Sequence, residues 1–162
     1  MKKFICCISI LLSLGCDVSA AKNDTNLIWF DQYLPRITET VTGEITFELI
    51  PILNTLTEIW LKRDGGTTAE VSLPIMSALI KHPKLMLPML TEDSKSFERW
   101  LKQFNGIVFT DFSGDRKDQL ERMHSELEKS MIECLTRCDK ELIPFAEQIV
   151  EQLKNTMITV VD

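Results

Sequence analysis

Residues 45–70, ITFELIPILNTLTEIWLKRDGGTTAE, contain the clearest periodicity in the chain. Large apolar residues recur there every three or four positions: Ile45, Leu49, Ile52, Leu53, Leu56, Ile59 and Trp60. This spacing places them on one side of an α-helix. Asp64-Gly65-Gly66 predicts the end of that helix, because glycine readily takes the left-handed conformation that closes a helix. Thr67 with Glu70 has the form of a capping box and predicts the start of the next helix.

The same spacing extends in both directions from this segment. Upstream, a polar lead-in at 21–24 precedes a helix that begins at Thr25, is kinked or divided by Pro35 and ends at Gly43. Further helices are predicted at 67–81, at 94–104 with Asp93 or Ser94 as its cap, and at 115–153, with interruptions or bends at Pro51 and Pro144. Residues 85–90, which contain Pro88, are expected to form a short apolar turn or helix. The sequence therefore predicts an all-α fold, an irregular bundle or short stack of about seven helices, several of them proline-kinked.

One stretch, near 105–115, differs from the helical pattern around it. Residues 107–112 are mostly β-branched or aromatic, and Gly106 and Gly114 stand at the borders. We expect an ordered aromatic connection that packs on the helices, because no second strand is evident to pair with it. The apolar tail at 158–161 is expected to cover other residues or to fray.

Residues 1–20 have the organisation of an export signal. Lys2 and Lys3 precede an apolar run that ends at Gly15, and this run is shorter than the roughly 20 residues that span a bilayer. Val18-Ser19-Ala20 supplies the small residues that a signal peptidase reads. Cleavage before Ala21 would release a periplasmic or secreted protein.

A second processing route starts from the same residues. Leu12-Ser-Leu-Gly-Cys16 is a lipobox candidate, with a small residue before the cysteine, although Ser13 and Leu14 stand in the reverse of the usual order. In this route residues 1–15 are the signal and Cys16 is lipidated. Asp17 then predicts an inner-membrane lipoprotein that faces the periplasm. Both routes remain open from the sequence.

The remaining 142 residues, 21–162, have the size of one helical domain. The full chain carries a net charge of −6, and removing Lys2, Lys3 and Asp17 leaves 16 basic and 23 acidic side chains. This balance argues against nucleic-acid binding, which needs a concentrated basic face. It would attract a basic protein partner, and the alternative is that mild acidity serves solubility alone. No second long apolar stretch predicts a transmembrane span. The sequence does not determine the oligomeric state.

Two cysteines remain in the mature domain, Cys134 and Cys138. Their spacing of one helical turn allows an intrahelical disulfide, two buried thiols, or a bridge to another molecule. His124 lies ten and fourteen residues before them, about 15 and 21 Å along a helix, which is too far for a shared metal. With no catalytic motif either, we expect no cofactor, no metal and no enzymatic activity.

Two segments are candidates for binding a partner. Residues 83–90 are dense in large apolar side chains, including Met86 and Met89, and methionine adapts to varied partners. The alternative for this segment is a central helix that is buried all round. The other candidate set combines aromatic and acidic side chains: Phe109, Asp111, Phe112 and Asp115. The alternative there is a loop that is held in place by phenylalanine packing, with the acidic residues serving the turn.

These observations predict an exported, non-enzymatic binding protein of the bacterial envelope. Its size, address and class are shared by immunity proteins and inhibitors that neutralise a toxin or a wall-degrading enzyme. The runner-up is a structural accessory protein or lipoprotein of a secretion, conjugation or envelope complex. A hydrolase without a recognisable motif is the third alternative.

Overall fold

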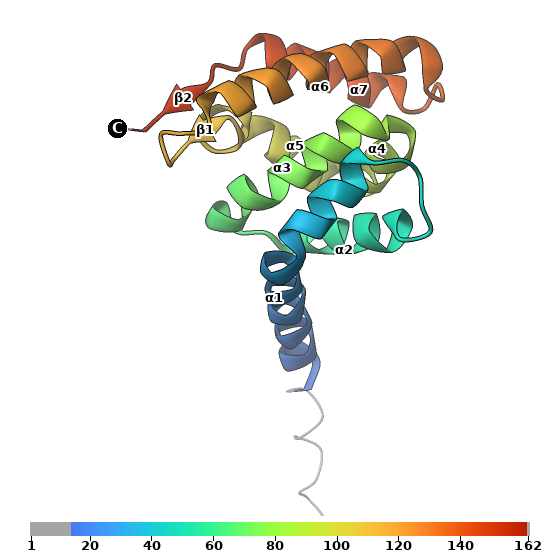
Figure 1. Ribbon diagram of the computed structural model, residues 1–162. Coiled ribbons are helices and arrows are strands. Elements are labelled where there is room, and N and C mark those ends of the chain that lie inside the picture. The colour runs from blue at the N-terminus through green and yellow to red at the C-terminus, as the bar shows by residue number, and fades with distance from the viewer. Residues whose placement is uncertain (1–13, 162) are drawn as a thin grey trace, which may run out of the picture.

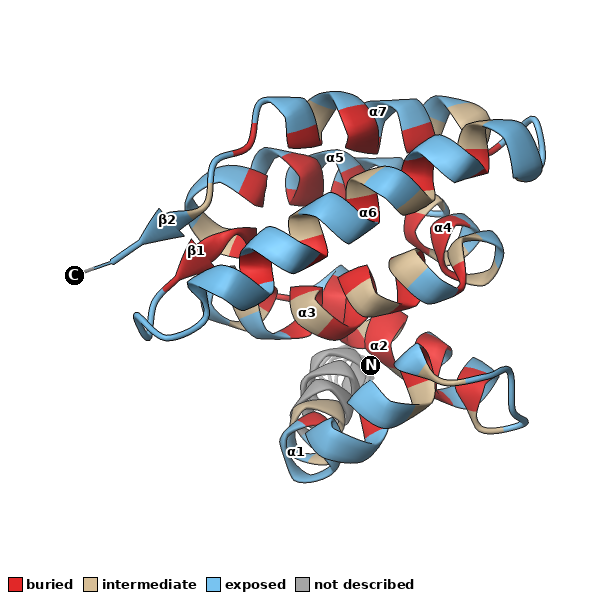
Figure 2. Ribbon diagram, turned by 45° about the horizontal axis from the view of Figure 1, so that its top comes forward, coloured by how far each residue is buried: buried red, intermediate tan, exposed pale blue. Residues whose placement is uncertain are grey.

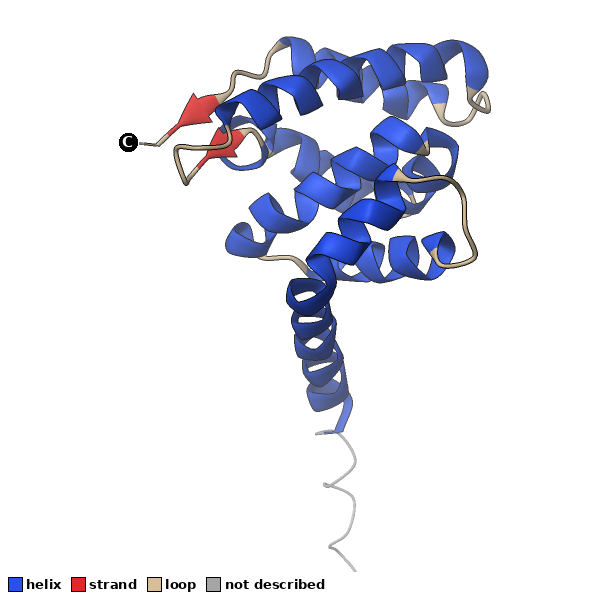
Figure 3. Cartoon of the chain, viewed as in Figure 1, coloured by secondary structure: helices blue, strands red, loops and turns tan. Residues whose placement is uncertain are grey.

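The computed structural model describes residues 14–161, with the backbone alone described for 14–24 and Gly65. Two very short strands are the β structure in this part of the chain (Figure 3). The helices are α1 (Leu14–Thr42), α2 (Leu49–Lys62), α3 (Gly65–Lys81), α4 (Pro83–Thr91), α5 (Ser94–Lys102), α6 (Lys117–Arg137) and α7 (Ile143–Lys154). A π-helical turn, η1, covers Phe104–Val108, and the strands are β1 (Thr110–Asp111) and β2 (Thr159–Val160). The predicted all-α architecture is confirmed.

The third helix, α3, lies at the centre of the arrangement. It packs against α1 and α2 on one side and against α6 on the other, and α4 follows it closely. In Figure 1 the pair α6 and α7 runs side by side along one face of the molecule, and the first turns of α1 project from the opposite face. A groove that joins α3 to α1 or α6 is therefore built from elements far apart in the sequence.

The buried side chains form one apolar cluster that all seven α-helices enter. Figure 2 shows the buried positions turned inward on each helix. Trp60 of α2 and Trp100 of α5 meet edge to face at 6.3 Å between ring centroids. The indole nitrogen of Trp100 donates a hydrogen bond of 2.9 Å to Ser72 on α3, which satisfies a buried polar group. These contacts link α2, α3 and α5 within the core.

The boundary between α2 and α3 differs from the prediction. Asp64 is the N-cap of α3, and its carboxylate accepts a hydrogen bond of 2.8 Å from the backbone N–H of Thr67. Gly65 and Gly66 form the first turn of α3 instead of closing α2, and Thr67 is not the cap. The reason is the extended conformation of Asp64, which brings its short side chain over the free N–H groups of the helix start.

The N-terminal helices also correct the sequence analysis. The helix α1 runs without a break through 21–24 and through Pro35, where a polar lead-in and a division were considered. Ile45 is not part of the apolar stripe, because it lies in the connection before α2 and is 69% exposed. Pro51 falls in the first turn of α2, where a proline removes no helical hydrogen bond.

The two strands are 49 positions apart in the sequence and pair in parallel. Thr110 is in register with Thr159, and Asp111 with Val160. The N–H of Thr159 donates to the Phe109 carbonyl at 3.1 Å, and the N–H of Val161 donates to the Asp111 carbonyl at 3.0 Å. The expectation that segment 107–112 has no strand partner is therefore wrong. The apolar tail supplies the partner.

Asn105 holds that tail in place. Its amide nitrogen donates to the Asn155 carbonyl at 3.1 Å, and its amide oxygen accepts from the N–H of Met157 at 3.2 Å. Gly106 follows with φ of 86°, a conformation that residues with a side chain rarely adopt. The turn after α5 thus both redirects the chain into β1 and fixes β2 beside it.

Candidate functional site

The loop after β1 is organised by one carboxylate. Asp111 accepts hydrogen bonds at Oδ1 from the N–H of Ser113 (3.1 Å), the hydroxyl of Ser113 (3.0 Å) and the N–H of Gly114 (2.8 Å). Its Oδ2 accepts a fourth, of 2.7 Å, from the N–H of Arg116. Gly114 has φ of 77°, which suits glycine and lets the chain turn back toward this carboxylate. The loop is therefore braced from within.

The charge of Asp111 is part of this brace. Burial acts to raise the pKa of Asp111, but the hydrogen bonds from Arg116, Ser113 and Gly114 outweigh it and hold the pKa below its ordinary value. The ionised form is the one that accepts all four bonds. Asp111 is almost fully buried, so the predicted role of a residue that contacts a partner is wrong for this side chain. It supports the loop instead.

The two phenylalanines of the loop have opposite environments. Phe109 is fully buried and meets Phe104 and His124 edge to face, at 5.4 and 5.2 Å between ring centroids. The prediction that Phe109 contacts a partner is therefore wrong, because its ring fills the core. Phe112 is 58% exposed, and Asp115 is also exposed. Asp115 shares the single hydroxyl hydrogen of Ser113 with Asp111, so it too is tied to the loop.

The second candidate segment is a central helix. In α4, Met86 is fully buried and Met89 is half-buried against the core. Met86 is therefore not available at the surface, which corrects its prediction as a contact residue. Of this pair, Met89 alone reaches the surface, where it borders a shallow hollow with Phe145 of α7.

The exposed Phe112 stands at one end of a groove along α3. The groove consists of two adjoining hollows of about 450 and 400 Å³, which share Glu70, Leu73 and Arg116. β1 and the following loop border the first hollow, α1 borders the second, and α6 borders both. The apolar side chain of Leu34 lies at the far end of the groove and is 38% exposed.

Several polar groups of the groove lack a partner in the part of the chain that the structure describes. Among the described residues, Asp31, Glu70 and Arg116 have no ion pair, although all three line the second hollow. The Nε–H of Arg116 donates to the Ser113 hydroxyl at 3.3 Å, which leaves its terminal nitrogens unused. The buried hydroxyl of Thr110, in the wall of the first hollow, also has no hydrogen-bond partner. Such groups are suited to a polar ligand.

Sequence reasoning missed this groove. Glu70 was assigned to a helix cap, and neither Arg116 nor Leu73 was singled out. The available signal in the sequence was the pair of small residues Gly66 and Ala69, three positions apart on α3 and next to Glu70. Small side chains at these two positions leave room above the helix. The neighbouring walls come from distant segments, so their approach could not be read from local spacing.

A third hollow, between α1 and α2, is slightly larger, at about 480 Å³. Trp29, Tyr33 and Phe47 line it, and Phe47 is 89% exposed. Its charged groups already satisfy each other, because Arg36 and Glu48 form an ion pair of 2.6 Å. We therefore place the candidate site in the groove along α3, where Asp31, Glu70 and Arg116 have no ion pair among the described residues.

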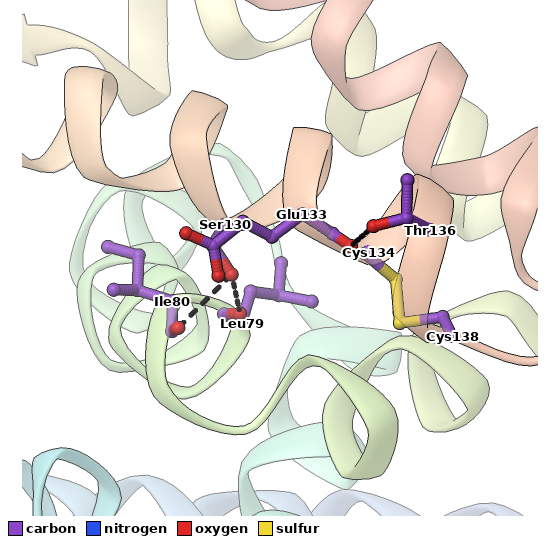
Figure 4. The surroundings of a disulfide bond; sticks show 7 residues. All are labelled: Leu79, Ile80, Ser130, Glu133, Cys134, Thr136 and Cys138. Carbon is purple, nitrogen blue, oxygen red and sulfur yellow. Dashed lines mark hydrogen bonds between the residues drawn. A yellow bond between two sulfur atoms is a disulfide. The ribbon is translucent and has the colours of Figure 1, made fainter.

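Cys134 and Cys138 form a disulfide at the end of α6 (Figure 4). Their Cα atoms are 4.8 Å apart, within the range that a disulfide spans, and Cys138 is the C-cap residue of α6. Of the three alternatives for this pair, the structure has the internal bridge. It lines a hollow of about 340 Å³ beside the buried His82, whose pKa is lowered by burial and by the charge of Lys81.

The remaining predictions concern the export signal, His124, membrane spans and metal sites. The signal assigned to residues 1–20 lies outside the described residues up to position 13, and Cys16 is described only as backbone within α1. His124 is half-buried, with Nε2 3.0 Å from the Leu153 carbonyl. Within residues 14–161, no helix has the length and apolar character to cross a membrane. In the same part of the chain, no three His, Cys, Asp or Glu side chains gather in a metal-binding arrangement.

No protein-family model, curated protein or solved structure matches this chain. The assignment of the candidate site to the groove along α3 and the loop that carries Phe112 therefore depends on the geometry of these residues.

Proposed function

We propose that this protein is an exported, non-enzymatic binding protein of the bacterial envelope, and that it captures a protein partner with the surface around Phe112. The observation that carries the proposal is the exposed aromatic ring on a loop that is braced by four hydrogen bonds to Asp111. A rigid loop loses little conformational freedom on binding, so an aromatic side chain placed on it contributes efficiently to affinity.

The charge of the molecule supports a basic partner. The chain has a net charge of −6, and an acidic surface accelerates the approach of a positively charged protein. Immunity proteins and inhibitors that block a toxin or a wall-degrading enzyme act in this way, by covering the partner without chemistry. We assign the protein to that class as a proposal.

The proposed location follows from the N-terminal sequence. Release before Ala21 places the domain in the periplasm or outside the cell, whereas lipidation of Cys16 anchors it to the inner membrane. Mass spectrometry of the mature protein separates the two routes, because it finds either a free Ala21 or an acylated Cys16. A mature chain that still begins at Met1 would contradict export.

The binding proposal is tested by placing a photo-crosslinking phenylalanine analogue at position 112 of the full chain in its own host. A matched variant carries the analogue at Ile132, which is 49% exposed on α6 and lies outside the groove. We expect one defined protein adduct from position 112 and none from position 132. With that partner purified, Phe112→Ala should weaken binding at least about tenfold, the usual effect of removing an interface aromatic. Equal adducts from both positions, or unchanged binding by Phe112→Ala, would reject the proposal.

One observation supports the alternative of an accessory lipoprotein. The helix α1 is continuous from Leu14 to Thr42, so a lipid on Cys16 would be joined to the domain by a helix. In that case the adduct from position 112 would be a subunit of an envelope complex, and the mature protein would carry the acylated Cys16. If the protein crosslinked to position 112 is soluble and the mature form of this chain begins with a free Ala21, this alternative is excluded.

A further inference from the structure

The groove along α3 has the length of a short peptide segment. Its floor follows α3 from Gly66 to Ser77, which is about 17 Å at 1.5 Å per residue. An extended chain covers the same distance with about five residues. The two hollows adjoin along this length, and an extended segment, unlike a helix, leaves its main-chain carbonyl groups free to accept hydrogen bonds from the walls.

The charges in the groove indicate what that segment carries. Asp31 and Glu70 border the second hollow on α1 and α3, and neither has an ion-pair partner among the described residues. Both stand over an apolar floor that includes Leu73 and Met123. A lysine or arginine side chain fits this arrangement, because its stem covers apolar surface while its charged end meets the carboxylates.

The remaining polar groups suit a peptide backbone. Arg116 lies where the two hollows meet, and its terminal nitrogens can donate to main-chain carbonyl groups. Thr110 is buried in the wall of the first hollow, with a hydroxyl that lacks a partner. A hydrogen bond from either group to a peptide carbonyl would satisfy a donor that has no partner among the described residues. Phe112 and Leu34 are placed to contact apolar side chains at the two ends of the segment.

We infer that this groove binds an extended segment of about five residues from the partner protein, with a basic side chain between Asp31 and Glu70. The inference rests on the proposed function, because it states how the partner is recognised at that site. The acidic residues disfavour nucleic acids and anionic lipid surfaces, which would bring negative charge to Asp31 and Glu70.

The test uses a synthetic library of seven-residue peptides on beads and the purified domain. We expect the bound peptides to share one Lys or Arg flanked by apolar residues. Glu70→Lys should reverse this preference and enrich peptides that carry Asp or Glu at the same position. Glu147→Lys on α7 is the matched control, since Glu147 is exposed and lies outside the groove, and it should retain the basic preference.

The outcomes separate this inference from the proposed function. Peptides without a charge preference, or a preference that Glu70→Lys leaves unchanged, would overturn the inference. So would a dimer of this chain that Glu70→Lys disrupts, because the groove would then bind a second copy. If the library yields no bound peptide while position 112 still forms its adduct, the groove inference fails and the proposed function stands. If both experiments fail, the binding proposal is rejected as well. Glu70 is exposed and unpaired, so equal melting temperatures should show that the variant is folded.

Discussion

Segments 83–90 and 109–116 both contain residues that the sequence offered as partner contacts, yet the fold uses the two segments differently. In the first, α4 buries Met86, Leu87 and Leu90 among neighbouring helices. In the second, Phe109 points into the core while Phe112, three residues on, remains exposed. The density of apolar residues in a segment thus indicates burial, and the exposed contact residue has to be identified by the local turn. Here that turn is made by Asp111.

The largest expected effect tests this contrast directly. Phe109→Ala should lower the free energy of unfolding by about 3–5 kcal/mol and Met86→Ala by about 2–5 kcal/mol, because each leaves a cavity in the core. Phe112→Ala should change it by less than about 0.5 kcal/mol, as is usual at exposed positions. Urea denaturation of the three variants measures these values. A loss for Phe112→Ala similar to that for Phe109→Ala would show that the two rings are not in different environments.

The next effect concerns the brace that distinguishes the second segment. The pKa of Asp111 is below its ordinary value in the folded state, so its ionised form favours folding. This contribution is complete above the unfolded pKa, near 4, and is lost as the pH falls through the lower folded pKa. We expect the amides of Gly114 and Arg116 to stay protected from hydrogen exchange, after correction for the intrinsic rate, until the pH drops below about 4.

Asp111→Asn supplies the control for that measurement. The amide retains one acceptor oxygen and cannot accept all four hydrogen bonds, so the loop amides should exchange faster than in the wild type at neutral pH. Their protection should also lose its dependence on acid. Asp118→Asn, at an exposed carboxylate in the first turn of α6 that makes no hydrogen bond to the loop, should leave both properties unchanged. Protection in Asp111→Asn that still falls with acid would assign the effect to another group.

The helices could be predicted from the sequence because their signals are local. The apolar spacing at 49–60 and 120–134 identifies two of them, and Asp93 was already a candidate cap; it accepts a 3.0 Å hydrogen bond from the Ser96 N–H. The pairing of β1 with β2 depends on contacts between residues 49 positions apart, which no short window contains. The two-residue strands are also too short to show an alternating pattern.

The candidate site was predicted only in part for the same reason. Aromatic and acidic residues drew attention to the loop after β1, and Phe112 is indeed at the surface there. Which of the loop residues are buried depends on the chain folding back over Asp111. The groove joins α1, α3 and α6, so Asp31, Glu70 and Arg116 become neighbours only in the folded protein.

The disulfide beside α4 is expected to have a moderate effect. Pro83, Lys84 and Leu85 of α4 share a hollow with Cys134 and Cys138, so the bridge lies next to the buried segment. It closes a loop of only a few residues, and the chain-entropy contribution of such a loop is about 2 kcal/mol or less. Cys134→Ala with Cys138→Ala should therefore cost less than Phe109→Ala in urea denaturation. A loss larger than that of Phe109→Ala would show that the bridge, and not core packing, holds this side of the molecule.

The smallest effect is expected at Asn105, which holds β2 beside the loop. Its two hydrogen bonds are exposed, so Asn105→Ala should cost only about 1 kcal/mol. The change should be local, with faster hydrogen exchange at the amides of Thr159 and Val161, because these donate to β1. Asn155→Ala is the control, since it removes a side chain but keeps the carbonyl that Asn105 contacts. If β2 keeps its protection in Asn105→Ala, the strand pairing alone fixes the tail. If Asn155→Ala loosens β2 equally, the end of α7, and not the Asn105 clamp, determines where the tail lies.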